Sequence, residues 1–84
     1  DVMWVVEQVV FMSLDRRLAM HLLEAAAMSG SDTVTTTHEA IARDLGSARE
    51  VVTRMLNRFQ EERLVTVGRG TVTLTDRDGL YALT

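Results

Sequence analysis

The chain has 84 residues, enough for one domain, and its composition of 46% hydrophobic and 25% charged residues is typical of a folded globular protein. The absence of Cys excludes a disulfide framework, a cysteine-based metal site and a thiol nucleophile. The net charge of −3 excludes the strongly basic character that would by itself indicate nucleic-acid binding, so a DNA-binding surface would require local clustering of the nine Arg residues.

The N-terminal segment Val2–Phe11 is apolar and rich in Val, and it is compatible with a strand or with a helix that buries most of its circumference. Because the chain begins with Asp1 rather than Met, we expect it to be a fragment of a longer protein. The segment lacks the basic start of a signal peptide. No stretch approaches the roughly 20 apolar residues that cross a bilayer, so no membrane contact is expected.

A helix is predicted after this segment, because Leu14, Leu18 and Leu22 recur at the spacing of one helix face. Ser13 is expected to cap its first turn, since a hydroxyl oxygen can accept a hydrogen bond from an N–H group that has no partner there. Gly30 is expected to end the helix.

Two helices separated by a tight turn are predicted in the middle of the chain, after a short β-branched strand at Thr33–Thr35. Thr37 is the expected N-cap of the first helix, which spans about two turns and ends at Gly46. Its expected inward side chains are Ala40, Ile41 and Leu45.

The second of these helices, expected over residues 48–62, has two contrasting faces. Ser47 and Glu50 fit the S-x-x-E capping box at its start. Its apolar stripe follows the spacing i, i+3, i+4, i+7 and consists of Val52, Met55, Leu56 and Phe59. Its polar face carries Arg49, Glu50, Thr53, Arg54, Asn57 and Arg58.

Beyond this helix the period of the apolar residues changes from 3.6 to 2, which indicates a β-hairpin over residues 64–74 around the turn Gly68–Gly70. A short terminal helix capped by Thr75 or Asp76 follows. Helix, tight turn, helix and hairpin together predict an α+β, mostly α fold. This fold is a winged helix-turn-helix with a small antiparallel β-hairpin wing.

The polar face of the second helix suits the edges of DNA bases. Residues 47–60 contain three Arg and one Glu, a local net charge of +2. Arg can bind O6 and N7 of guanine with two hydrogen bonds, and Glu can accept one from N4 of cytosine. Arg49, Glu50 and Arg54 are therefore candidates for base reading. Two structural alternatives stay open: Glu50 can serve the capping box, or it can pair with Arg54 on a solvated face.

Four segments of the chain resemble the Crp/Fnr transcription regulators, relatives of the cyclic-AMP receptor protein. They are residues 14–19 (LDRRLA), 37–46 (THEAIARDLG), 47–56 (SAREVVTRML) and 68–74 (GRGTVTL). The resemblance covers about residues 8–83, and its most specific part is the Gly-x-x-Arg-Glu-x-x-x-Arg core. The chain departs from the family pattern at Ala40, where an acidic residue often completes a capping box.

The resemblance implies a sequence-specific DNA-binding domain of a bacterial-type regulator, with recognition helix 48–62 in the major groove and wing 64–74 on the DNA backbone. Residues 13–84 would form this domain, and residues 1–12 would be the tail of a dimerisation helix or a hinge. Arg49, Glu50 and Arg54 would face bases. The candidates for phosphate or supporting contacts are Thr37, His38, Ser47, Thr53, Asn57, Arg58 and Arg69.

The same resemblance implies the partners. The expected partners are double-stranded DNA with a pseudo-palindromic operator, a second copy in a homodimer, and RNA polymerase at the loop Ser29–Asp32. Members with an Arg at the position of Arg49 favour TGTGA-like half-sites, whereas Fnr-like members without it favour TTGAT. We therefore expect the TGTGA-like class. No cofactor is expected in this chain, because a small effector such as a cyclic nucleotide would bind a sensor domain outside it, and cytoplasmic residence is expected.

The sequence does not support catalysis, because it lacks a Cys nucleophile, a G-x-S-x-G motif and a P-loop, and no pair of its carboxylates can be placed in a cleft. No metal site is expected, since His21 and His38 have no matching acidic cluster. Met12, Met20 and Met28 are interpreted as core filling. One alternative function stays open: a winged helix for protein–protein contact or dimerisation without DNA binding, which the net charge of −3 favours.

Overall fold

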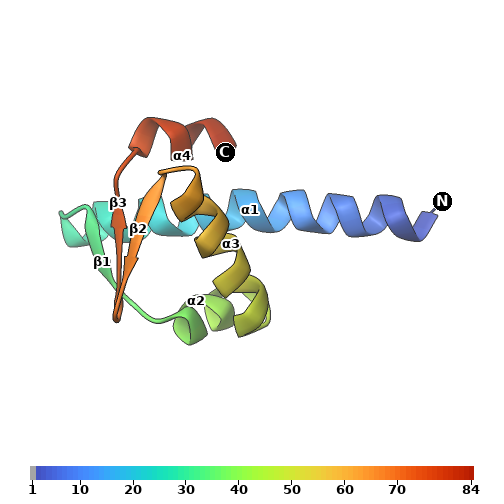
Figure 1. Cartoon of the computed structure of the whole chain (residues 1–84), viewed down its shortest axis with the longest axis horizontal. Coiled ribbons are helices and arrows are strands. Elements are labelled where there is room, and N and C mark those ends of the chain that lie inside the picture. The colour runs from blue at the N-terminus through green and yellow to red at the C-terminus, as the bar shows by residue number, and fades with distance from the viewer. Residues whose placement is uncertain (1) are drawn as a thin grey trace.

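A computed structural model describes the backbone of residues 2–84 and the side chains of residues 14–84. The elements in chain order are α1 (Val2–Ser29), β1 (Thr33–Thr35), α2 (His38–Leu45), α3 (Arg49–Glu61), β2 (Val65–Gly68), β3 (Thr71–Leu74) and α4 (Arg77–Leu83). Figure 1 shows α4 on one side of α1, with α2 and the start of α3 on the other side and the sheet at the end of α1 far from the N-terminus. The predicted α+β, mostly helical architecture is confirmed.

The first helix is longer than predicted. Val2–Phe11 takes the helical one of its two alternatives, and α1 continues without a break to Ser29. The predicted N-cap at Ser13 is therefore wrong, because Ser13 lies inside the helix with no Gly or Pro nearby to interrupt it. The predicted end at Gly30 is confirmed. The division between residues 1–12 and 13–84 stays a prediction.

The described part of α1 packs on the domain through a broad apolar face. The side chains of Leu18, Ala19, Leu22, Leu23 and Ala26 are buried. The predicted core role of the methionines is wrong for Met20 and Met28, whose side chains are exposed, and the side chain of Met12 lies outside the described residues.

Helix α2 begins and ends as predicted. The Thr37 hydroxyl oxygen accepts a hydrogen bond from the backbone N–H of Ala40 at 3.0 Å. Gly46 follows the helix with φ +66°, a left-handed conformation that Gly adopts without strain. The buried residues are Ile41, Ala42 and Leu45. Ala40, which the sequence placed inward, is only half-buried, because Ala42 rather than Ala40 faces the core.

The predicted capping box at Ser47 and Glu50 is wrong. Helix α3 begins at Arg49, so its N-cap is Ala48, which has no side-chain oxygen to accept a hydrogen bond. Ser47 instead belongs to the end of α2, where its backbone N–H donates to the carbonyl of Ala42 at 2.9 Å. This bond is typical of the Schellman motif that closes a helix. Glu50 is left free for another role.

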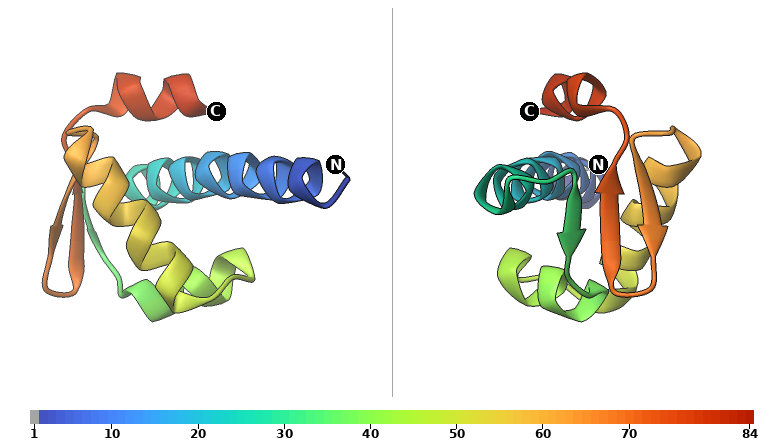
Figure 2. Two further views of the ribbon diagram at one scale, coloured as in Figure 1. Left: turned by 45° about the vertical axis from the view of Figure 1, so that its right-hand side comes forward. Right: turned by 90° about the vertical axis from the view of Figure 1, so that its left-hand side faces the viewer.

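The sheet has three antiparallel strands in the order β1-β3-β2. The predicted strand Thr33–Thr35 is confirmed as β1, and it joins the hairpin in one sheet, which the sequence did not predict. Strands β2 and β3 form the predicted hairpin, with Val65 opposite Leu74 and Val67 opposite Val72. Strand β1 pairs with the other edge of β3, placing Val34 opposite Val72. Figure 2 shows the three strands side by side, with the hairpin turn reaching toward the same end of the molecule as α2.

One apolar core joins all the elements. It includes the inner face of α3, the buried side chains of α1 and α2, Val65, Val72 and Leu74 from the hairpin, and Leu80 from α4. The predicted cap of α4 at Asp76 is confirmed, since its carboxylate accepts a hydrogen bond from the Gly79 N–H at 3.0 Å. The core therefore fixes the orientation of α3 relative to the hairpin.

Candidate nucleic-acid interface

Helix α3 presents the two faces that its sequence predicts. Val52, Met55, Leu56 and Phe59 are each at most 2% exposed and pack into the core. Arg49, Glu50, Arg54 and Asn57 are exposed, and Thr53 is half-buried. A helix held by one face leaves the other free to enter the major groove of DNA.

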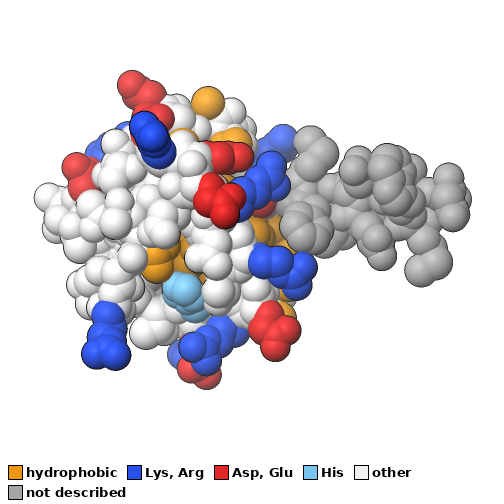
Figure 3. Space-filling model, viewed as in Figure 1, with side chains coloured by type: hydrophobic (Ala, Val, Ile, Leu, Met, Phe, Trp, Pro, Cys, Tyr) orange, Lys and Arg blue, Asp and Glu red, His pale blue; other side chains and the backbone are white. Residues whose placement is uncertain are grey.

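Three of the four Arg residues proposed to contact DNA have no acidic partner among the described side chains. Among side chains 14–84, Arg49, Arg54 and Arg69 form no ion pair, and the i,i+4 pair between Glu50 and Arg54 does not form. In Figure 3, Arg side chains lie along the lower edge of the molecule, with acidic side chains beside some of them, where Figure 1 shows the hairpin turn, α2 and the start of α3. Arg49, Arg54 and Arg69 thus form a cationic edge on a domain whose net charge is negative.

The hairpin turn lies beside α2 because β1 connects them. The Thr36 N–H donates to the Gly70 carbonyl at 3.1 Å, continuing the pairing of β1 with β3 as far as the turn. Gly70 has φ +70°, which favours Gly at this position of the turn. Thr36 immediately precedes the N-cap of α2, so the turn that carries Arg69 and the first turn of α2 lie next to each other.

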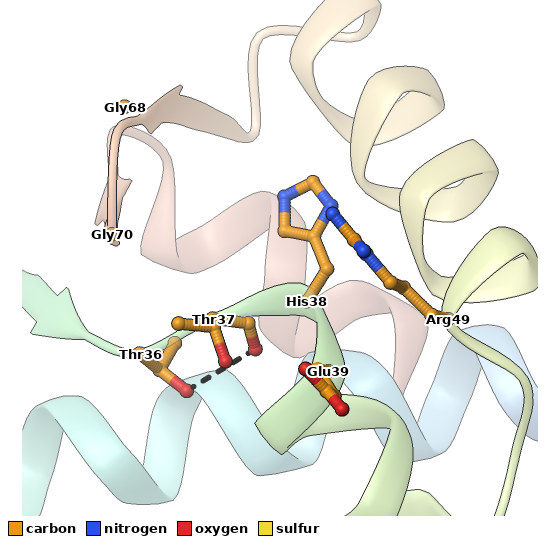
Figure 4. A pocket seen from close by; sticks show the side chains of 7 residues that line it. All are labelled: Thr36, Thr37, His38, Glu39, Arg49, Gly68 and Gly70. Atoms are coloured by element: carbon orange, nitrogen blue, oxygen red, sulfur yellow. Dashed lines mark hydrogen bonds between the residues drawn. The ribbon is translucent and has the colours of Figure 1, made fainter.

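A hollow lies between these parts of the chain. It is lined by Thr36, Thr37, His38, Glu39, Arg49, Gly68 and Gly70, which come from the start of α2, the start of α3 and the wing (Figure 4). The His38 and Arg49 side chains extend toward each other, and the Glu39 carboxylate lies apart from them (Figure 4). Hydroxyl, imidazole and guanidinium groups around one hollow are suited to hold an anion such as a phosphate.

A second hollow continues from the first along α3. It is lined by Ala48, Arg49, Glu50, Thr53 and Arg54, so Arg49 belongs to both. The three predicted base-reading residues therefore lie together on one surface. Thr37 and His38, which were predicted as phosphate or supporting contacts, line the first hollow, which shares Arg49 with this surface.

His38 and Thr53 are in contact, which the sequence did not predict. The Nδ1 atom of His38 lies 2.8 Å from the Thr53 hydroxyl oxygen, and both residues are half-buried. The contact joins the first residue of α2 to the middle of α3. Sequence reasoning also missed Thr36, Glu39, Gly68 and Gly70 as lining residues, although the Gly-x-Gly turn was a signal for the last two.

Arg58 has acidic partners, unlike the other exposed Arg residues of α3. Its guanidinium lies 3.4 Å from a carboxylate oxygen of Asp15 and 3.5 Å from one of Glu62. Burial raises the pKa of Asp15 above its ordinary value of 3.8; the positive charge of Arg58 acts against this rise, and the negative charge of Glu62 adds to it. Asp15 thus holds the Arg58 side chain toward α1. The side chains of Ser47 and Asn57, by contrast, have no such internal partner among the described side chains.

Asp15→Asn should be more stable than the wild type at pH 7, by up to about 1 kcal/mol. Because the pKa of Asp15 is raised, its stabilising contribution is present when the carboxyl group is protonated and is lost as the pH rises from 3.8 through the raised pKa. Asn is uncharged at every pH, so the difference between the two proteins should shrink toward zero as the pH falls to about 4. Urea unfolding at pH 4 to 7 measures this difference, and a variant less stable than the wild type at pH 7 would show that the ion pair with Arg58 outweighs the burial of the charge.

The described residues contain neither a candidate metal site nor a candidate membrane-spanning helix. His21 lies 3.3 Å from a carboxylate oxygen of Asp44, but residues 14–84 contain no group of three His, Cys, Asp or Glu side chains arranged to hold a metal ion. None of the helices in the described part of the chain is sufficiently long and apolar to span a membrane.

The fold and the cationic edge define a winged helix-turn-helix domain of the DNA-binding kind, and comparison with known proteins agrees. The model of the Crp-like helix-turn-helix domain matches residues 16–83. The chain belongs to this family, the DNA-binding domain of Crp/Fnr transcription regulators.

Similar proteins are transcription regulators. The chain is 31% identical to the transcriptional regulator SdrP of Thermus thermophilus, over 93% of this chain and 42% of that protein. A solved structure of a crp/fnr-family regulator from Eubacterium rectale is 49% identical, with a TM-score of 0.83 over 99% of this chain and 38% of that one. The catabolite activator protein of Thermus thermophilus is 26% identical, with a TM-score of 0.86 over 98% and 38%.

The chain thus spans about two fifths of the length of these relatives. Their names describe regulators of transcription, which agrees with the prediction that the chain is no enzyme and favours DNA binding over the interaction-only alternative.

Proposed function

We propose that the chain recognises a specific DNA sequence by placing α3 in the major groove and the wing turn on the DNA backbone. The observation that carries this proposal is the group of exposed Arg residues, Arg49, Arg54 and Arg69, that have no acidic partner among the described side chains. An internal ion pair would have to break before such a residue could contact DNA. These three residues are free to bind without that cost.

In this proposal Arg49, Glu50 and Arg54 read base edges. Arg49 and Arg54 would each bind guanine through O6 and N7, and Glu50 would accept a hydrogen bond from the N4 amino group of cytosine. Glu50 is available for this role because it takes part in neither a capping box nor an ion pair among the described residues. The Arg at position 49 supports a TGTGA-like half-site, by resemblance to the family members that carry it.

The backbone contacts come from around α3. Arg69 on the wing turn and Thr37 and His38 at the start of α2 would contact phosphates. Ser47 and Asn57 would contact or support the same strands, and Thr53 would support the backbone contacts. Arg58 would act mainly in support, because Asp15 and Glu62 hold its guanidinium.

The parent protein would act as a homodimer on a pseudo-palindromic operator. The two copies of α3 would then lie about 34 Å apart, one turn of the duplex. RNA polymerase would contact the exposed loop Ser29–Asp32, and a small effector such as a cyclic nucleotide would bind outside this chain. DNA binding would place the parent protein in the cytoplasm.

Fluorescence anisotropy with a labelled duplex tests the proposed function. Affinity for a duplex that carries one TGTGA half-site should exceed that for a scrambled duplex of the same composition, and it should fall steeply as salt rises from about 50 to 200 mM. Equal affinity for both duplexes would remove the half-site assignment. No binding to either duplex at low salt would contradict the function itself.

Arg69→Ala should weaken binding to the cognate and the scrambled duplex by the same factor, because a phosphate contact does not depend on sequence. The slope of log affinity against log salt should become shallower by about one unit, as expected for the loss of one contact. The measurement is the salt titration of the variant beside the wild type on both duplexes. A loss confined to the cognate duplex would assign Arg69 to base reading instead.

A further inference from the structure

The contact between His38 and Thr53 indicates a role for Thr53 that rests on the proposed function. His38 is the first residue of α2 and reaches across to α3, where its Nδ1 lies 2.8 Å from the Thr53 hydroxyl oxygen. Among the described side chains, the His38 ring is the one hydrogen-bond partner of that hydroxyl. The two half-buried groups therefore form a local bridge between the two helices.

The direction of the hydrogen bond in this bridge determines what the other nitrogen of the ring presents to the hollow. Figure 4 shows that nitrogen, Nε2, on the side of the ring that faces Gly68 and Gly70. A neutral imidazole carries one hydrogen, so its two nitrogens are one donor and one acceptor. When Thr53 donates its hydroxyl hydrogen to Nδ1, the ring hydrogen is on Nε2, and the ring presents an N–H group to the hollow.

An N–H group at this position suits an anion. The hollow is also lined by Thr37 and by the guanidinium of Arg49, which has no acidic partner among side chains 14–84. With the opposite tautomer, the bare Nε2 would face the same oxygens with its lone pair and repel them. Glu39 lines the hollow as well, but its carboxylate is set apart from the ring (Figure 4).

We propose that Thr53 is a positioning residue that acts through His38. By donating its hydroxyl hydrogen to Nδ1, Thr53 holds the ring in one orientation and keeps the hydrogen on Nε2, which donates to a DNA phosphate in the hollow between α2 and the wing. Thr53 itself makes no contact with DNA. The contact of His38 with the phosphate therefore depends on a residue of the recognition helix.

A double-mutant cycle separates this role from a direct contact of Thr53. Thr53→Val removes the hydroxyl at nearly constant volume, Thr53→Ser keeps it, and His38→Asn keeps a polar group near Nδ1 but none near Nε2. His38→Asn should lower the affinity for both the cognate and the scrambled duplex about 10- to 150-fold, the effect of one hydrogen bond to a charged group. Thr53→Val should lower it by a similar factor, and Thr53→Ser should restore most of the loss.

The double variant should bind no more weakly than His38→Asn alone, because without the imidazole the Thr53 hydroxyl has nothing to position. His38→Gln, whose amide nitrogen lies near the position of Nε2, should keep part of the affinity. His21→Asn removes the other histidine, outside the hollow, and is the matched control that should leave the affinity unchanged. Melting curves of all variants show that each is folded at the temperature of the binding assay.

Nitrogen-15 NMR of the histidine rings in the free protein at pH 8 provides a readout independent of DNA. The proposal expects the hydrogen of His38 on Nε2 in the wild type. Finding it on Nδ1 would overturn the proposal while leaving the proposed function intact. Equal losses from Thr53→Val in the wild type and in the His38→Asn background would also overturn it, since they would assign Thr53 its own contact. Failure of the wild type to bind either duplex would instead contradict the proposed function, and the inference with it.

Discussion

Arg54→Ala should lower the affinity for the cognate half-site by about 1 to 3 kcal/mol, or roughly 5- to 150-fold, and should relax the preference at one base pair. Arg54 is exposed on the face of α3 opposite the core and lies beside Glu50 and Arg49 in one hollow. Its guanidinium can make two hydrogen bonds to a guanine edge, and Ala can make none. Anisotropy titrations with duplexes that change one base pair at a time measure both the loss and the position affected.

Arg77→Ala is the matched control for Arg54→Ala. It removes the same charge from α4, which lies on the other side of α1 from α2 and the start of α3 (Figure 1), and its partner Asp32 is also exposed. The control should change the affinity little and equally for all duplexes. Equal losses on the cognate and the scrambled duplex for Arg54→Ala would contradict a base-reading role.

Phe59→Ala should lower the free energy of unfolding by about 3 to 5 kcal/mol. Phe59 is 2% exposed and is among the largest side chains of the core that holds the inner face of α3. A protein of this length has a total stability of about 4 to 13 kcal/mol, so this single cavity would remove a large share of it. Urea unfolding followed by circular dichroism gives the difference.

Glu61→Ala on the same helix is the comparison for Phe59→Ala. Its side chain is exposed at the last residue of α3, and the change should alter the stability by less than about 0.5 kcal/mol. A packed Phe ring leaves a cavity when it is replaced by Ala, and such a cavity is costly because α3 cannot move to fill it without rearrangement. A loss below about 1 kcal/mol for Phe59→Ala would therefore contradict the packing of this ring in the core.

The parts of the fold that sequence predicted correctly are those encoded by neighbouring residues. The stripe from Val52 to Phe59 repeats every 3.6 residues, and the hairpin repeats every two around its Gly-x-Gly turn. Thr37 caps α2 because the capping oxygen and the N–H of Ala40 are three residues apart. The predicted capping box at Ser47 is wrong although its spacing fits, because Ser47 takes part in closing α2 and the N-cap of α3 is Ala48.

The contacts that sequence did not predict join residues far apart in the chain. His38 and Thr53 are 15 positions apart, and Arg58 and Asp15 are 43 apart. The pairing of β1 with β3 likewise joins Thr33 with Thr73, 40 positions away. No local periodicity encodes such contacts, since they depend on how the helices and the sheet pack. The polar face of α3 was predicted from the sequence, but the hollow that joins it to the wing was not.

An NMR titration at low salt tests whether α3 and the wing read DNA. The ¹⁵N-labelled chain is titrated with a short duplex carrying one TGTGA half-site and, separately, with a scrambled duplex. We expect shift changes that are concentrated in residues 47–58, in Gly68–Gly70 and at Thr37 and His38, and that are larger with the half-site. Shift changes that leave α3 and the wing unaffected, or none at all, would contradict this expectation.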